Sequence, residues 1–132
     1  YNKSADALCV ATDSDTLRRS PKLFKVAEET FVPVHHSKEL QSELPVLLFV
    51  GAERCVHCRK LWHLLNHANV AERLSLTEKR YLDADHHQDL ATHLGVRGLP
   101  TLLAVQQGKS IARAPATPSL EQLLQWLNDT GF

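Results

Sequence analysis

Runs of apolar residues divide this chain into segments with two periodicities, which predict strands and helices in turn. The longest run, residues 45–50, contains no polar position and is typical of a strand that is buried on both faces. Pro33 marks one further strand as an edge strand, because proline cannot donate a sheet hydrogen bond. Gln107-Gly108-Lys109 is a hairpin signal between the last two strands. The shorter runs predict strands at residues 31–34, 79–84, 101–106 and 110–113.

Leucines at helical spacing predict the helices. One helix is expected over about 55–69, and a short one over 86–94 that ends at Gly95. Thr117 or Ser119 can cap a final helix. This helix carries Leu120, Leu123, Leu124 and Leu127. A weaker pattern over 35–43 predicts one more short helix.

Composition indicates one domain. The 132 residues suffice for a single core, so we interpret residues 31–132 as one α/β domain and residues 1–30 as an N-terminal extension or linker. Fifteen basic residues balance fifteen acidic ones, so the chain lacks the excess of basic residues that is typical of nucleic-acid-binding proteins. No apolar segment is long enough to span a membrane. The chain begins at Tyr1 and contains no methionine, so we expect that residues before Tyr1 were removed. Cleavage of a signal peptide is one explanation.

The strongest chemical signal is Cys55-Val56-His57-Cys58, which follows the buried strand and opens a helix. A thiol in a first helical turn ionises more easily, because unsatisfied N–H groups and the positive end of the helix dipole lie there. Cys55, nearer the helix end, is expected to be the exposed attacking thiol, and Cys58 to lie deeper and resolve the mixed disulfide. His57 adds a titratable donor that can stabilise a thiolate when it is protonated. The motif therefore predicts catalytic roles for Cys55, Cys58 and His57.

The third cysteine, Cys9, is interpreted as a small apolar residue, with a second redox or intermolecular thiol as the alternative. Three cysteines do not identify the compartment of the protein.

Eight histidines raise the question of a metal. His63 and His67 have a chelating spacing, but the helical period places them on the solvent face, away from Cys58. We expect no metal site there and interpret His35-His36 and His86-His87 as surface residues. A copper or zinc binding or delivery module that uses the two thiols of the motif remains the alternative function.

Further stretches join the motif. Gly95-Val96-Arg97-Gly98-Leu99-Pro100-Thr101-Leu102-Leu103 precedes the predicted hairpin, and Asp83-Ala84-Asp85 ends the preceding strand. Together with the strand-to-helix dithiol, they resemble the thioredoxin family over about residues 46–127. The resemblance implies a thioredoxin fold, with a central mixed sheet flanked by helices. It implies a protein thiol–disulfide oxidoreductase that needs no cofactor and acts on protein disulfide or dithiol substrates with a redox partner protein.

The resemblance also implies a substrate groove. The Leu99–Pro100 bond is expected to be cis, and its loop to stand beside the dithiol so that an extended substrate segment can pair with it. Arg54, Val56, Leu99 and Pro100 are the expected substrate-binding residues.

The departures from the family pattern concern proton transfer. The usual tryptophan before the first cysteine is Arg54, and the usual buried aspartate and its lysine partner align with Phe49 and Tyr81. The familiar proton relay is therefore absent, and water, His57 or Glu53 is expected to take the proton from Cys58. The histidine before the second cysteine resembles bacterial periplasmic disulfide oxidants. We therefore expect a periplasmic or other extracytoplasmic location, with the cytoplasm as the alternative, and leave open whether the protein reduces, oxidises or relays electrons.

Overall fold

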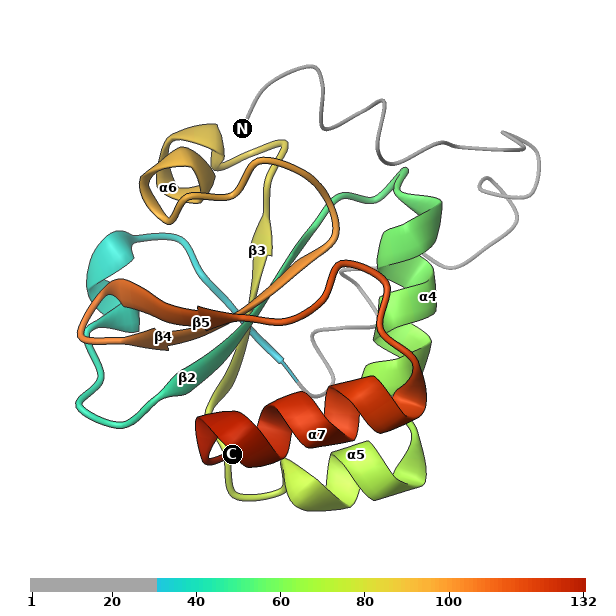
Figure 1. Cartoon of the computed structure of the whole chain (residues 1–132). Coiled ribbons are helices and arrows are strands. Elements are labelled where there is room, and N and C mark those ends of the chain that lie inside the picture. The colour runs from blue at the N-terminus through green and yellow to red at the C-terminus, as the bar shows by residue number, and fades with distance from the viewer. Residues whose placement is uncertain (1–30) are drawn as a thin grey trace.

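A computed structural model describes residues 31–132 (Figure 1). Its strands form one five-stranded sheet in the order β1-β3-β2-β4-β5. The strands are β1 (Val32–Pro33), β2 (Val46–Gly51), β3 (Lys79–Asp83), β4 (Thr101–Gln106) and β5 (Lys109–Arg113). The helices are the 3-10 helix η1 (Ser37–Leu40) and the α-helices α4 (Val56–Leu65), α5 (Ala68–Arg73), α6 (Gln88–His93) and α7 (Leu120–Thr130).

The sheet is mixed, as predicted. β1 and β2 both run parallel to β3, whereas β4 is antiparallel to β2 and β5 is antiparallel to β4. Because parallel strands end at the same edge of a sheet, the segments that follow β1, β2 and β3 lie along one edge. Those segments contain His35-His36, the cysteine motif and the loop 84–87, respectively.

The helices cover the two faces of the sheet. Figure 1 shows α4, α5 and α7 together on one side and α6 apart from them on the other. α4 buries Leu61, Trp62 and Leu65, and α7 buries Leu123 and Leu127, so the predicted leucine spacing marks the inward faces of both helices. β2 is buried along its whole length, as its uninterrupted apolar run predicts.

Two predicted helices differ from the structure. The expected helix over 55–69 is broken into α4 and α5, because Asn66 Nδ2 donates to the Trp62 carbonyl at 2.9 Å and the His67 ring accepts the Asn69 N–H at 3.2 Å. These two side chains cap the end of one helix and the start of the next. Over 35–43, only η1 forms.

Short local signals place the remaining elements within one or two residues. The hairpin turn has positive φ at both Gln107 (52°) and Gly108 (76°), which a two-residue turn between twisted strands requires. Ser119 caps α7 and accepts the Gln122 N–H at 3.2 Å. The predicted extension, residues 1–30 with Cys9, lies outside the described residues. No helix within 31–132 is long and apolar enough to cross a membrane.

Candidate active site

The two cysteines of the motif form a disulfide at the start of α4. Their Cα atoms are 5.1 Å apart. Cys55 is the N-cap residue of α4, and its Sγ accepts the backbone N–H of Cys58 at 3.1 Å. The Cys55 sulfur therefore lies at the positive end of the helix dipole, with an amide donor directed at it, which is an arrangement that stabilises a thiolate.

Both cysteines are buried, with 0% of either residue exposed. The prediction that Cys55 is exposed is therefore wrong for the disulfide form, although Cys58 does lie deep as expected. In the turn before the helix, Cys55 N–H donates to the Ala52 carbonyl at 3.1 Å, and Cys55 belongs to the hydrophobic core cluster.

Gly51, the last residue of β2, faces the second cysteine. A Cβ atom at this position would lie 3.1 Å from Cys58 Sγ and 3.3 Å from Cys58 Cβ. Real Cβ atoms rarely make contacts this short, so the absent side chain gives Cys58 its room. Sequence reasoning missed this residue; the signal was a glycine that ends an apolar run four residues before the motif.

An aromatic cluster includes Phe49, whose Cζ lies 3.4 Å from the position of a Cβ atom on Gly51, and it occupies a place where the family pattern has ionisable residues. Phe49 and Tyr81 are register partners on β2 and β3, and both are buried. The Phe49 ring stacks on Trp62 at 5.9 Å, and Phe31 meets both rings edge-on. At these two sheet positions the chain therefore has neither a carboxylate nor an amine.

Two arginines flank the dithiol. An Arg59 guanidinium nitrogen donates to the Glu53 carbonyl at 3.1 Å and lies 3.8 Å from the Glu53 carboxylate. Arg54 lies 3.7 Å from the Asp85 carboxylate, which comes from the loop after β3. The first contact holds the link between β2 and α4 to the helix, and the second connects that link to the neighbouring loop. The Arg54–Asp85 pair is exposed and contributes little to stability, so its effect is positional.

A pocket of about 340 Å³ lies beside the motif and brings together His57, Leu99 and Pro100. The Leu99–Pro100 peptide bond is cis. Thr101 Oγ1 donates to the Gly98 carbonyl at 2.7 Å and closes the loop before β4. A second pocket of about 320 Å³, lined by Lys60, Leu61 and Leu64 among others, shares His57 with the first.

Arg54 and Val56, the other two expected substrate-binding residues, line neither pocket. Arg54 is exposed and Val56 is half-buried. They flank Cys55 along the chain, so they border the site rather than form its groove.

The metal-binding alternative finds no support. Within residues 31–132, no group of three or more histidine, cysteine, aspartate or glutamate side chains is arranged to hold a metal ion.

A disulfide within Cys-x-x-Cys, at the start of a helix that follows a central strand of a mixed sheet, defines a thiol–disulfide oxidoreductase. Comparison with known proteins agrees. The family model described as Thioredoxin matches residues 24–129, and the chain belongs to the thioredoxin family. The predicted function is thereby confirmed in its general form: the protein is a thiol–disulfide oxidoreductase of a family that acts on protein disulfides with a reductase partner.

The chain is similar to two bacterial thioredoxins. The thioredoxin of Rickettsia bellii (strain RML369-C) is 24% identical over 90 residues, which cover 68% of this chain and 85% of the relative. The thioredoxin of Rickettsia felis (strain ATCC VR-1525 / URRWXCal2) is 25% identical over 89 residues, which cover 67% of this chain and 84% of the relative.

Solved structures share the fold. A thioredoxin from Trypanosoma brucei brucei superposes with a TM-score of 0.64 at 18% identity and covers 76% of this chain and 89% of its own. The thioredoxin NaTrxh from Nicotiana alata superposes with a TM-score of 0.61 at 19% identity and covers 76% of this chain and 91% of its own. The oxidised mitochondrial thioredoxin 3 from Saccharomyces cerevisiae superposes with a TM-score of 0.64 at 15% identity and covers 76% of this chain and 96% of its own.

Proposed function

We propose that Cys55 is the attacking thiol and Cys58 the resolving thiol in exchange with protein disulfides. The observation that carries this assignment is the Cys58 N–H directed at Cys55 Sγ from the first turn of α4. Cys58 Sγ instead lies beside Gly51, 3.1 Å from the position that a Cβ atom on this residue would take. The two thiols thus differ in how easily each becomes the nucleophile.

The exchange has two steps. In the reducing direction, the Cys55 thiolate attacks one sulfur of the substrate disulfide, and the other sulfur leaves as a thiolate that takes a proton from water. Cys58 then gives its proton to water or a nearby base and attacks Cys55 Sγ, which expels the second substrate thiolate. Two electrons pass to the substrate and the Cys55–Cys58 disulfide remains; the reverse sequence oxidises a dithiol.

The pocket beside the motif supports a substrate-binding role for its residues. Leu99 and Pro100 offer an apolar wall just before β4, and His57 lies across the pocket on α4. An extended substrate segment that pairs with the loop backbone would bring its disulfide to Cys55. Arg54 and Val56, on either side of Cys55, would contact the same segment.

The experiment compares Cys58→Ser with Cys55→Ser, each in its reduced form and mixed with a protein disulfide. Cys58→Ser accumulates a mixed disulfide because no resolving thiol remains, whereas Cys55→Ser accumulates none. Non-reducing gels with mass spectrometry of the trapped band measure this. The double variant is the control for Cys9. Trapping through Cys58 would reverse the assignment, and no trapping by either variant would overturn the proposed exchange.

An extracytoplasmic location is part of the proposal. It rests on the histidine at position 57, between the two cysteines, which is shared with periplasmic disulfide oxidants. Fractionation of the source cells tests it, and recovery of the protein with cytoplasmic markers would contradict it.

A further inference from the structure

Five of the eight histidines of the chain surround one pocket of about 710 Å³. We name it the histidine pocket; its imidazoles belong to His35, His36, His86, His87 and His93. They come from three places in the sequence: the segment after β1, the loop after β3, and α6. Sequence reasoning placed four of them on the surface, but it did not show that they gather.

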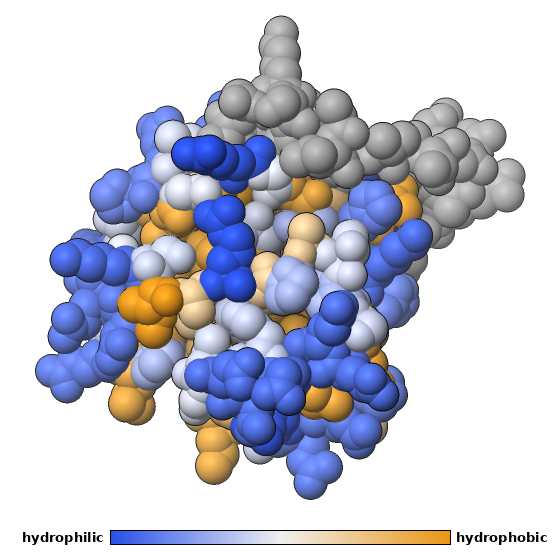
Figure 2. Space-filling view, viewed as in Figure 1, coloured by the Kyte–Doolittle hydropathy of each residue, from blue (hydrophilic) through white to orange (hydrophobic). Residues whose placement is uncertain are grey.

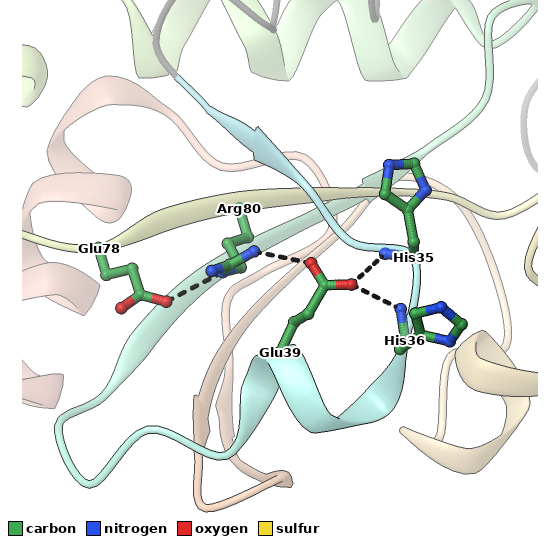
Figure 3. A network of polar contacts seen from close by, with 5 residues as sticks. All are labelled: His35, His36, Glu39, Glu78 and Arg80. Carbon is green, nitrogen blue, oxygen red and sulfur yellow. Dashed lines mark hydrogen bonds and ion pairs between the residues drawn. The ribbon is translucent and has the colours of Figure 1, made fainter.

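The backbone on one side of the pocket is fixed while its imidazoles stay available. The Glu39 carboxylate accepts the backbone N–H groups of His35 at 3.0 Å and His36 at 2.9 Å. It also accepts from Arg80 at 3.1 Å, and Arg80 in turn donates to Glu78. Figure 3 shows both histidine rings turned away from Glu39.

The opposite side is built by the loop after β3 and by α6. The His87 ring lies 6.0 Å from the His35 ring, at 64° to it, so the two sides meet across the pocket. His86 Nδ1 lies 2.6 Å from an Asp83 carboxylate oxygen. This hydrogen bond, with the negative charge of Asp83, raises the pKa of His86.

The formal charge of the pocket depends on how many of its histidines are protonated. With neutral imidazoles its formal charge is −2, from Asp85 and Asp89, and with all five protonated it is +3. Of the charged groups next to it, Asp83 is bonded to His86, and Arg54 lies 3.7 Å from Asp85. Histidine is the side chain that can gain a charge between neutral and mildly acidic pH, so protonation there would reverse the sign of the pocket.

The pocket also adjoins the reactive disulfide. Asp85 lines the pocket and contacts Arg54, which directly precedes Cys55 in the chain. Both regions lie at the carboxyl edge of the parallel strands. Figure 2 shows hydrophilic side chains gathered on the side of the molecule where Figure 1 places α6 and η1. A polypeptide that presents a disulfide to Cys55 can therefore reach the pocket with a flanking segment.

We propose that the histidine pocket binds an acidic segment of the protein whose disulfide meets Cys55, and that it does so below neutral pH. The inference rests on the proposed exchange through Cys55 and adds a substrate class to it. Each imidazolium offers N–H donors and a positive charge to a carboxylate, and several carboxylates on one flexible segment can use them together. A metal ion is the weaker occupant, because these residues form no ligand group in the described structure.

The experiment measures the second-order rate constant between the reduced full chain and two peptide disulfides, in EDTA, from pH 5.5 to 7.5. One peptide carries three glutamates on each side of its disulfide, and the other carries glutamines. The ratio of the two rate constants removes the pH dependence of the thiolate, which both peptides share. We expect the ratio to rise roughly fivefold as the pH falls, the size expected of a few exposed charge pairs acting together.

The pocket variant is the double substitution His35→Asn and His87→Asn. His87 precedes α6 as its N-cap residue without a side-chain cap bond, and asparagine suits that position. The matched control is His63→Asn with His67→Asn: both residues are exposed and outside the pocket, and His67 is likewise an N-cap residue. The pocket variant should lose the rise in ratio, and the control should keep it.

The outcomes separate this inference from the function on which it rests. If neither peptide oxidises the reduced protein at any pH, the proposed exchange fails. If both react with a ratio that does not change with pH, the exchange stands and the histidine pocket does not bind acidic segments. A rise that survives in the pocket variant, or that is lost equally in the control, would also overturn the inference.

Discussion

Replacing Gly51 by alanine tests how closely the sheet limits the space around Cys58. The new Cβ atom would lie 3.1 Å from Cys58 Sγ, 3.3 Å from Cys58 Cβ and 3.4 Å from Phe49 Cζ. Ordinary contacts are about 3.5–4.0 Å, so these buried neighbours must yield by a few tenths of an ångström. Overpacking of this kind costs about 1–3 kcal/mol, and the stiffer unfolded chain returns about 0.4–1 kcal/mol. We expect a net loss of about 1–2 kcal/mol in the free energy of unfolding of the disulfide form.

The same substitution should change the reduction potential. In the disulfide form Cys58 Sγ is tied to Cys55 and cannot move away, whereas the reduced Cys58 side chain can rotate. The oxidised form is therefore destabilised more than the reduced form, and the protein becomes more oxidising. If rotation relieves between half and all of a 1.4 kcal/mol cost, the potential rises by about 15–30 mV.

Denaturant unfolding of both redox forms and equilibration with glutathione measure the two effects. Gly131→Ala is the control, since it has no atom within 4 Å of the new Cβ but a φ of +84°. That variant should lose about 1 kcal/mol equally in both forms and keep its potential. An oxidised Gly51→Ala protein as stable as the wild type, or a more negative potential, would refute the reasoning.

Three further predictions concern charge near the site. We expect a protonated His57 to favour the Cys55 thiolate, so His57→Pro should give a more negative potential in redox equilibration; an equal potential would remove His57 from the mechanism. Burial opposes ionisation of Glu39, but the N–H groups of His35 and His36, with Arg80, outweigh it and lower its pKa. The stability that Glu39 contributes is present above its ordinary pKa of 4.5 and is lost as the pH falls through the lowered value. Glu39→Gln should therefore lower the free energy of unfolding by about 1 kcal/mol at pH 7 and by almost nothing near pH 2. A difference between wild type and variant that stays the same at both pH values would contradict this. Phe49→Asp places a carboxylate in the aromatic cluster and should lower the free energy of unfolding by at least about 3 kcal/mol, measured by chemical denaturation at pH 7. A variant as stable as the wild type would contradict the apolar surroundings described for Phe49.

The parts of the fold that sequence predicts well are those set by local signals. The apolar run of β2, the Gln107-Gly108 turn and the Ser119 cap each lie within a few residues, and each has its structural counterpart. The break between α4 and α5 was missed because buried positions continue through it to Val70, so the apolar pattern alone predicts one helix. Hydrogen bonds of Asn66 and His67 decide that break, and hydropathy does not register them.

The site divides in the same way. Cys55 and Cys58 are found from their spacing, because the disulfide joins neighbouring turns of one segment. The burial of Cys55 and the packing of Gly51 depend on how β2 meets α4, which no local pattern states. The histidine pocket depends on the parallel register of β1 and β3, in which Val32 pairs with Arg80 and so brings residues far apart in sequence to one edge.

The aromatic pair Phe49 and Tyr81 has a consequence for how this protein can be altered. A buried carboxylate and amine would tie the stability of the core to the protonation events of the reaction, because each buried ion needs its partner. Here ring packing holds the core around Phe49, and Arg54, next to the dithiol, stands at the surface. Substitutions at Arg54 or His57 could therefore change the charge around the dithiol at little cost in the free energy of unfolding. Substitutions of the aromatic residues would change the thermal stability of the protein separately.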